Sequence, residues 1–321
     1  MDENRVEALL TAMRWRPGVD PGDIARRPPR LRGSGWDNEM WEIGALPDGT
    51  AVVLRLPHRD LARPLLAREA LALTALETTP VTTPRLLAEL DAEHPHGPAL
   101  LVTWLDGELL LDRVAGTAPA DPAVQRHARS LARVLSALHR PVGPEHPRSA
   151  VRGVPLAEVE ARMEADLRAL PSTLRIADGA RAREVLGEVF AAGLAAPAWD
   201  GPALFLHGDP HPGNLLVVPA PGTPSGEDLA LLDWGDVSAG DPAGDLGDVL
   251  LLDPSGGALD AYRAPRDGEA LHARARAWAA RYAASMLANA HRGQAALGEE
   301  RLVRQLGACA LRTAEGLATD R

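Results

Sequence analysis

The sequence predicts an α+β protein with two unequal parts. A small N-terminal part is built from antiparallel strands and one long helix, and a larger, mostly helical C-terminal part carries one hairpin. Two observations predict this division: alternating and β-branched segments fall before residue 105, and long segments with helical periodicity follow it. We expect an N-terminal region over residues 1–105, a hinge at residues 100–107, and a C-terminal region over residues 106–321.

The N-terminal elements are predicted from turn and cap signals. A Pro-Asp-Gly turn joins an alternating stretch to a β-branched run, which is typical of a hairpin over residues 39–57. Asp60 can cap the helix that follows it, with Pro64 tolerated in the first turn. The other elements expected in this region are a short helix over 3–13, the helix over 61–76, and strands over 84–90 and 99–105.

Helical periodicity dominates the C-terminal region. Apolar residues recur at helical spacing in five segments, 123–139, 156–170, 180–195, 269–291 and 300–318. Only two short apolar runs, at 215–218 and 229–234, indicate strands, and a loop rich in Pro, Gly and Ser joins them. We therefore expect one small hairpin within a helical region.

The composition is that of an ordinary globular protein, and it excludes several classes. Of 321 residues, 45% are hydrophobic, and the longest apolar runs are too short to span a bilayer. The N-terminus lacks the basic-then-apolar pattern of a signal peptide, so a cytoplasmic location without a membrane partner is expected. A net charge of −10 argues against nucleic-acid binding. Cys309, the only cysteine, lies in a helical pattern and is expected to be buried.

Polar residues at the two ends of the predicted hairpin carry the chemistry. The stretch HGDPHPGNLLVV (207–218) places Asp209 and Asn214 before the first strand, and Asp233 ends the second strand. An amide and a carboxylate at adjacent strand ends can share one hard cation such as Mg²⁺, whose shell phosphate often completes. Asp209, one loop away, could accept a proton from an attacking hydroxyl. This is the division of labour that phosphoryl transfer requires.

The same residues carry a family resemblance. HGDPHPGNLLV followed by LLDWGDVSAGDPAGDLGDVL resembles the signature of the aminoglycoside phosphotransferase family, a branch of the protein-kinase-like fold that includes macrolide phosphotransferases and small-metabolite kinases. The resemblance implies a bilobal fold, with Asp209 as catalytic base and Asn214 and Asp233 as Mg²⁺ ligands. It also implies that His207 is structural and that Asp245 braces the catalytic loop.

Two positions of this motif need separate interpretation. Pro210 departs from the larger apolar residue that is usual in the family, and it stiffens the loop. Asp241, in a Gly-Asp-Pro sequence, is interpreted as a helix cap with Pro at the first helical position rather than as a catalytic group.

The nucleotide-binding residues are predicted by the same resemblance. Gly33, Ser34 and Gly35 resemble a turn that covers phosphates, although an isolated Gly-x-Gly is a common loop. The family's phosphate-binding cation and its orienting glutamate correspond to Arg55 and Glu69; this chain contains no lysine. The alternatives are a solvated strand residue for Arg55 and an exposed helix position for Glu69.

The predicted hinge would meet the purine of ATP or GTP near Trp104 and Leu105, which are alternatively core residues. ATP is the expected nucleotide, with GTP as the alternative that the sequence does not exclude. The oligomeric state also remains open.

The acceptor is predicted only as a small molecule with a hydroxyl group. Eleven acidic residues and no Lys or Arg lie between Asp200 and Asp260, which favours a cationic acceptor such as an aminoglycoside or a macrolide. Metal binding, caps and solvation would account for about half of these carboxylates. The residues that bind the acceptor are expected in the helices after residue 120, with Trp278 as one candidate.

The function predicted is ATP- and Mg²⁺-dependent phosphorylation of a hydroxyl group on a small molecule, and there are three alternatives to it. The first is a kinase of a primary metabolite of the choline, amino-sugar or homoserine type. The second is a nucleotide-binding pseudokinase scaffold, which the arginine at position 55 motivates and the intact Asp209, Asn214 and Asp233 set argues against. The third, a kinase of proteins, is disfavoured because no long segment separates Asp233 from the GDPAGD stretch at residues 240–245, which leaves little platform for a peptide.

Overall fold

The computed structural model describes residues 1–35, 37–176, 179–223, 225–263, 268–293 and 300–319. The chain divides into two compact units. The first contains Met1–Gly107 and Leu232–Asp236, and the second contains Glu108–Leu231 and Val237–Arg321. The first unit is mainly sheet and the second mainly helix, so the predicted α+β class is confirmed.

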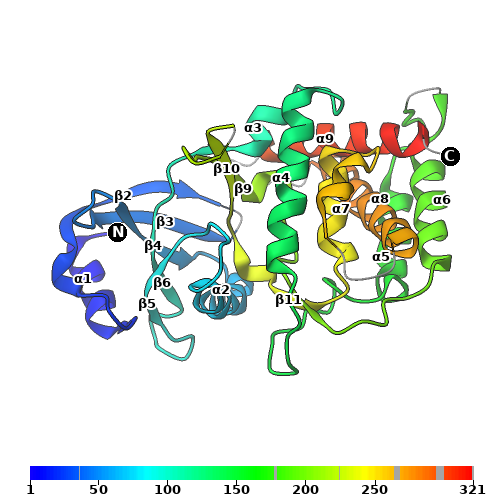
Figure 1. Ribbon diagram of the computed structural model, residues 1–321. Coiled ribbons are helices and arrows are strands. Elements are labelled where there is room, and N and C mark those ends of the chain that lie inside the picture. Colours follow the sequence, from blue (N-terminus) through cyan, green and yellow to red (C-terminus); the bar gives the residue numbers. More distant parts are fainter. Residues whose placement is uncertain (36, 177–178, 224, 264–267, 294–299, 320–321) are drawn as a thin grey trace. The chain divides into compact units, whose positions relative to one another are not determined.

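The first unit contains a six-stranded sheet in which the strand order is β1-β5-β6-β4-β3-β2 (Figure 1). Every pair of neighbours in it is antiparallel. The strands are β1 (Arg14–Trp15), β2 (Ala25–Ser34), β3 (Asn38–Ala45), β4 (Ala51–Pro57), β5 (Leu86–Leu90) and β6 (Ala99–Thr103). The hairpin predicted over residues 39–57 is confirmed as β3 and β4.

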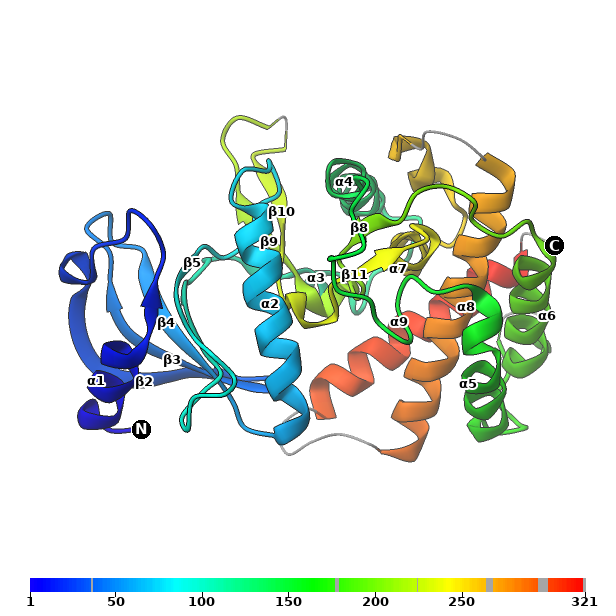
Figure 2. The same ribbon diagram turned by 90° about the horizontal axis from the view of Figure 1, so that it is seen from below.

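Helices cover both faces of this sheet. Helix α1 (Glu3–Ala12) packs its Leu9 and Leu10 into one hydrophobic cluster with alternate strand residues such as Leu54 and Leu101. Helix α2 (Arg63–Leu76) packs against β5 and β6, on the side of the sheet away from α1 (Figure 2). Because side chains alternate along a strand, residues next to Leu54 in β4 face α2. This alternation directs Arg55 toward α2.

Two expectations for this region were wrong. Asp60 does not cap α2, because residues Asp60–Ala62 form a 3₁₀ turn and α2 begins at Arg63 without a side-chain cap. Strand β2 was not expected, because its Pro28-Pro29 pair argues against a strand interior. The pair is tolerated because β2 is an edge strand and its register with β3 shifts between Arg26 and Arg30.

The second unit packs helices around α8 (Gly268–Arg292), which contacts α5, α6, α7 and α9 (Figure 2). The five predicted helices are all present. The helices are α3 (Leu110–Val114), α4 (Pro122–Leu138), α5 (Leu156–Ala169), α6 (Ala182–Ala195), α7 (Ala243–Leu252), α8 and α9 (Glu300–Thr319). Alanine is abundant on α8, and its small side chains let the neighbouring helices approach closely.

The predicted hairpin is confirmed as β9 (Leu215–Pro219) and β10 (Glu227–Leu231), with Leu215 opposite Leu231. The expectation that it would be the only strand pair of this region was wrong. A two-residue strand, β7 (Glu108–Leu109), pairs with β9, and β8 (Leu204–Leu206) pairs with β11 (Ser238–Gly240). Runs of two or three residues are too short to show a period of two, so periodicity could not reveal them.

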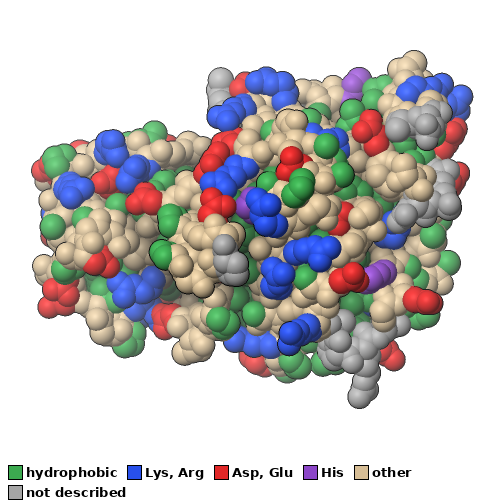
Figure 3. Space-filling model, turned by 45° about the horizontal axis from the view of Figure 1, so that its top comes forward, with side chains coloured by type: hydrophobic (Ala, Val, Ile, Leu, Met, Phe, Trp, Pro, Cys, Tyr) green, Lys and Arg blue, Asp and Glu red, His purple; other side chains and the backbone are tan. Residues whose placement is uncertain are grey.

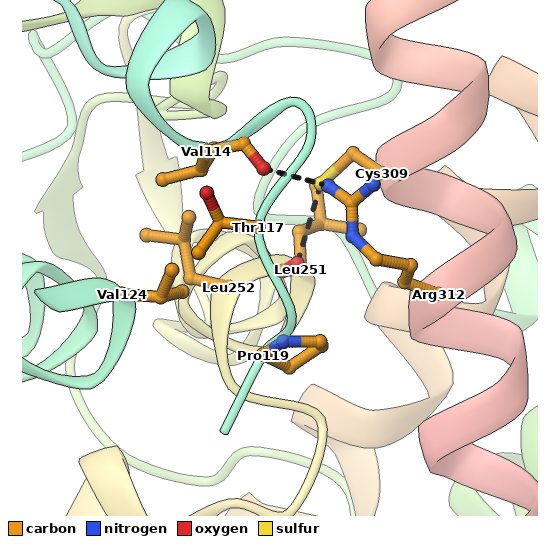
Figure 4. Close-up of a pocket in the computed structure, with 8 residues that line it drawn as sticks. All are labelled: Val114, Thr117, Pro119, Val124, Leu251, Leu252, Cys309 and Arg312. Atoms are coloured by element: carbon orange, nitrogen blue, oxygen red, sulfur yellow. Dashed lines mark hydrogen bonds between the residues drawn. The ribbon is translucent and has the colours of Figure 1, made fainter. Parts of the chain in front are cut away.

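Cys309 is buried, as predicted, and burial raises the pKa of its thiol to about 11. Its sulfur donates to the carbonyl oxygen of Leu251 at 3.3 Å. A small cavity lies beside it between α3, α7 and α9, where Arg312 donates to the last carbonyl of α3, that of Val114, at 3.1 Å (Figure 4). Cys309 is therefore a core residue.

A close backbone contact fixes β11 to the loop before α5. A Cβ atom at Gly240 would lie 1.8 Å from the carbonyl oxygen of Gly153. We expect Gly240→Ala to lower the free energy of unfolding by about 2–3 kcal/mol or more, because the backbone of Gly153 must move. Urea unfolding measures this change. Gly116→Ala, where nothing lies within 4 Å of the added carbon, is the control and should change it by less than about 0.5 kcal/mol.

None of the helices in the described part of the chain is long and apolar enough to cross a membrane.

Candidate catalytic site

Asp245 organises the loop that carries the predicted base. Its two carboxylate oxygens accept the backbone N–H groups of His207 at 2.8 Å and Gly208 at 2.9 Å, and His139 lies 3.0 Å from one of them. His207 is fully buried, and its Nδ1 accepts from the backbone N–H of Asp209 at 3.2 Å. The bracing role that the family resemblance implies for Asp245, and the structural role of His207, match this geometry.

The loop holds Asp209 and Asn214 together. The Asn214 side-chain nitrogen Nδ2 donates to the backbone oxygen of Asp209 at 2.9 Å, so the amide oxygen Oδ1 points away from that contact. A short 3₁₀ turn, Pro212–Asn214, leads into β9, and His211 accepts the N–H of Gly213 at 3.0 Å. Proline and glycine make this turn tight, which explains why poor strand formers stand where a buried strand begins.

The carboxylate of Asp209 lies between two basic side chains. Arg152 donates to its Oδ1 at 2.7 Å, and His211 Nε2 lies 3.7 Å from its Oδ2. Burial favours the neutral acid, but the charges of Arg152, His211 and His207 together hold the pKa of Asp209 below its ordinary value. Asp209 is therefore ionised at neutral pH, as a proton acceptor must be.

A second carboxyl group is buried near Asp209. Asp248, on α7, is only 1% exposed, and neither of its oxygens has a hydrogen-bond partner among the described residues. Burial, followed by the negative charge of Asp209, raises the pKa of Asp248 well above its ordinary value, and Arg152 only partly opposes this. The Asp248 carboxyl therefore binds its proton more tightly than an ordinary aspartate does.

The raised pKa of Asp248 predicts a pH-dependent stability. The folded state binds its proton more tightly than the unfolded state, so stability falls as pH rises from the unfolded pKa through the folded one. Asp248→Asn removes this loss, so the stability of the variant relative to the wild type should rise as pH increases through the raised pKa of Asp248. Urea unfolding of both proteins at several pH values measures the difference, and a difference that stays constant with pH would contradict the prediction.

The predicted cation and its orienting glutamate meet in the first unit. Arg55, on β4, and Glu69, on α2, form an ion pair with 2.5 Å between Nη1 and Oε1. Both are buried, so the alternatives of a solvated strand residue and an exposed helix position are wrong. Burial, against the attraction of Arg55 and with a smaller contribution from the charge of Asp233, raises the pKa of Glu69 to about 7.

Asp233 belongs to this same cluster. Its Oδ1 lies 4.0 Å from Arg55 Nη2, and half of its side chain is exposed, so the carboxylate remains accessible to a ligand. It has a φ of 59°, a left-handed conformation that Asp and Asn adopt more readily than most residues. The next residue, Trp234, is fully buried and donates its indole N–H to Thr83 at 2.7 Å, which fixes the segment in the first unit.

The other residues predicted to bind the nucleotide lie at strand ends of the first unit. Gly33 and Ser34 end β2, and Gly35 donates its N–H to Asn38 at 2.9 Å, so the three residues stand at a strand-to-strand turn. Trp104 follows β6, and its N–H donates to the carbonyl of Ala51 at 2.8 Å. Its ring lies 5.0 Å from the guanidinium of Arg32.

The Trp104 contact reduces the number of backbone donors that the predicted hinge can offer to a purine. The backbone N–H of Trp104 is already used within the sheet.

Three residues near the predicted chemistry were missed by the sequence analysis. Arg152, His211 and Asp248 surround or approach Asp209, and Arg152 is 57 positions away from it in the chain. His211 lies inside the analysed motif, so its proximity could have been noticed. Asp248 likewise lies inside the second quoted stretch, LLDWGDVSAGDPAGDLGDVL, whereas Arg152 belongs to no local pattern that marks it.

Some carboxylates of the acidic segment have structural roles, which weakens the argument that this segment attracts a cationic acceptor. Arg274 Nε donates to Oδ2 of Asp241 at 2.8 Å. The other carboxylate oxygen of Asp241 accepts the backbone N–H of Ala243, a contact of the capping kind predicted for Asp241. Four of the eleven carboxyl groups are buried, namely those of Asp241, Asp245, Asp248 and Asp253. On the face shown in Figure 3, acidic and arginine side chains are interspersed.

The donor set suits Mg²⁺. Mg²⁺ binds through one or two protein oxygens together with waters and substrate phosphates. The free amide oxygen of Asn214 and the half-exposed carboxylate of Asp233 are such oxygens. In the described parts of the chain, no three or more His, Cys, Asp or Glu side chains are grouped as a metal site.

Comparison with known proteins places these features in a family. The model of a phosphotransferase enzyme family matches residues 29–306, which contain every predicted site residue. No curated protein sequence matches this chain.

Solved structures share the fold over nearly the whole chain. The macrolide 2'-phosphotransferase MphH from Brachybacterium faecium, solved as the apoenzyme, is 24% identical, with 96% of this chain and 97% of that chain covered and a TM-score of 0.56. APH(2")-IIia, solved with GDP and kanamycin, is 17% identical, with 99% of each chain covered and a TM-score of 0.62. Macrolide 2'-phosphotransferase type I is 17% identical, with 94% of this chain and 95% of that chain covered and a TM-score of 0.56. The predicted bilobal, kinase-like fold is confirmed.

Proposed function

This chain belongs to the phosphotransferase enzyme family, and we propose that it transfers the γ-phosphoryl group of ATP, with Mg²⁺, to a hydroxyl group of a small molecule. The observation that carries the proposal is the loop held by Asp245, in which the side-chain amide of Asn214 donates to the backbone oxygen of Asp209. A positioned base beside a metal ligand is what phosphoryl transfer requires from a protein.

Each unit contributes one half of the chemistry in this proposal. In the first unit, Arg55 binds phosphate oxygens of the nucleotide, and Glu69 holds the guanidinium in place. In the second unit, Asp209 accepts the proton of the acceptor hydroxyl as that oxygen attacks the γ-phosphorus. Mg²⁺, held by Asn214 and Asp233, would offset the negative charge of the phosphates.

Asn214 and Asp233 stand next to the ends of the two hairpin strands. Leu215 pairs with Leu231 across the hairpin, Asn214 directly precedes Leu215, and Asp233 follows Leu231 by two residues. The ends of the two strands at which these residues stand are therefore the paired ends.

We propose an antibiotic as the acceptor, with a metabolite alcohol as the second candidate. The solved relatives include macrolide phosphotransferases and a complex with kanamycin, and this supports the first candidate. A cytoplasmic location, where ATP is available, belongs to the same proposal. A nucleotide-binding scaffold without activity is disfavoured, because the buried Arg55–Glu69 pair and the ionised Asp209 are both in place.

Transfer of ³²P from γ-labelled ATP to a panel of compounds tests the proposal. The panel should contain aminoglycosides, macrolides, and hydroxyl metabolites of the choline and homoserine type. We expect labelled product from at least one compound, only with a divalent cation, and none with the Asp209→Asn variant. Nucleotide binding without transfer to any hydroxyl compound and without ATP hydrolysis would favour the scaffold instead. GTP is tested in parallel.

A further inference from the structure

Arg152 reaches the catalytic carboxylate from a segment whose backbone is firmly anchored. The segment lies in the loop between α4 and α5. The carbonyl oxygen of Arg152 accepts from the Ser238 hydroxyl at 3.0 Å, and that of Gly153 accepts from the N–H of Asp241 at 3.1 Å. Gly153 has a φ of 67°, and an added Cβ would lie 2.4 Å from a methyl group of Leu206. The start of the Arg152 side chain is thus held against β8, which leads into the catalytic loop, and against β11, which pairs with β8.

The side chain of Arg152 is directed as well as anchored. Its guanidinium carbon lies 5.5 Å from the ring centre of Tyr282, on α8, and Nη2 lies 2.7 Å from Oδ1 of Asp209. A cation over an aromatic ring is stabilised by that ring, so Tyr282 limits where the guanidinium can go. Strands β8 and β11, which anchor the backbone, and helix α8, which carries Tyr282, therefore direct the Arg152 guanidinium to Oδ1 of Asp209.

The contact differs from a purely structural ion pair in the same unit. Arg274 and Asp241 form a pair whose side chains are 3% and 6% exposed. Arg152 and Asp209 keep 19% and 23% of their side chains exposed, so the pair stands at the surface that an acceptor must reach.

Resting on the proposed function, we propose that Arg152 is a positioning residue for phosphoryl transfer, which holds Oδ1 of Asp209 so that Oδ2 faces the acceptor hydroxyl. The step balances within the known reactants. The O–H bond of the acceptor breaks and its proton goes to Oδ2, while the hydroxyl oxygen bonds to the γ-phosphorus. The bond between that phosphorus and the bridging oxygen breaks, and ADP leaves with the electron pair.

This role explains why a planar, doubly anchored side chain stands at this position. A carboxylate that rotates about its last bond offers either oxygen at varying angles. Near-attack geometry is sensitive, and a misplacement of about 1 Å can cost on the order of 100-fold in rate. An arginine fixed by its backbone, by Tyr282 and by Asp209 removes that rotation.

Steady-state kinetics of Arg152→Met and Arg152→Lys test the inference with the acceptor found in the transfer assay. We expect Arg152→Met to lower kcat by about 10- to 100-fold, with the KM for ATP within about twofold of wild type. The kcat of Arg152→Lys, which keeps the charge and an N–H donor, should lie between those of Arg152→Met and the wild type. The matched control is Arg148→Met, in the same loop, and it should leave kcat unchanged.

Chemical rescue separates positioning from a merely structural role. Guanidinium ion at millimolar concentration should raise the kcat of Arg152→Ala several-fold and should not raise that of the control variant. A kcat for Arg152→Met within about threefold of wild type overturns the inference. So does an Arg152→Lys enzyme that is folded but as slow as Arg152→Met, or a folded Arg152→Ala enzyme that guanidinium does not activate.

Asp209→Asn keeps the two proposals apart. If it is inactive while the Arg152 variants are fast, only the positioning role fails. If it remains active, the assignment of the base fails.

Discussion

Asp209→Asn is expected to lower kcat by on the order of 100-fold or more, while the protein stays folded and still binds nucleotide. Asparagine has the shape of aspartate but cannot accept the acceptor's proton as a carboxylate does. The loop contacts to Asp245 and Asn214 use backbone atoms of His207, Gly208 and Asp209, so they survive the substitution. Steady-state kinetics with the identified acceptor, together with a thermal-shift titration of ATP and Mg²⁺, measure both halves of this expectation.

The control for this variant is Asp200→Asn, which removes a carboxylate from the loop that precedes β8. It should keep wild-type turnover. An Asp209→Asn enzyme within tenfold of the wild type would show that another group accepts the proton.

Asp233→Asn is expected to lower turnover by a comparable factor, on the order of 100-fold at fixed Mg²⁺, and to raise the Mg²⁺ concentration for half-maximal activity. The reason is that a neutral amide holds a hard cation less strongly than a carboxylate. Folding should be preserved, because asparagine tolerates the left-handed backbone of this position, whereas alanine would be strained there. Activity measured across a Mg²⁺ titration tests this.

Asp228→Asn is the matched control, since Asp228 stands on β10 and its carboxylate accepts the N–H of Leu229. Its Mg²⁺ dependence should equal that of the wild type. Equal Mg²⁺ curves for the Asp233 variant and this control would remove Asp233 from the metal site.

The sequence predicted those parts of the fold that repeat a pattern over many residues. The long helices follow from apolar spacing, and the hairpin over residues 39–57 follows from a turn between two strand patterns. It could not predict β7, β8 and β11, because two- and three-residue strands are stabilised by their partners and not by their own pattern. The edge strand β2 was hidden by two prolines that an edge tolerates.

The candidate site was predictable where its residues share a motif. Asp209 and Asn214 stand five residues apart, and the structure joins them by one hydrogen bond. Arg55 and Glu69 were aligned through the family, and the structure pairs them because β4 alternation turns Arg55 toward α2. Arg152 could not be predicted, since its approach to Asp209 depends on tertiary contacts of Gly153 and Tyr282.

A crystal structure with Mg²⁺ and a non-hydrolysable ATP analogue tests the central claim most directly. We expect one ion that the amide oxygen of Asn214 and a carboxylate oxygen of Asp233 both ligate at about 2.0–2.1 Å, together with phosphate oxygens. The Oδ2 atom of Asp209 should face the open acceptor side. A complex in which the nucleotide is bound but no single ion contacts both Asn214 and Asp233 would contradict the account.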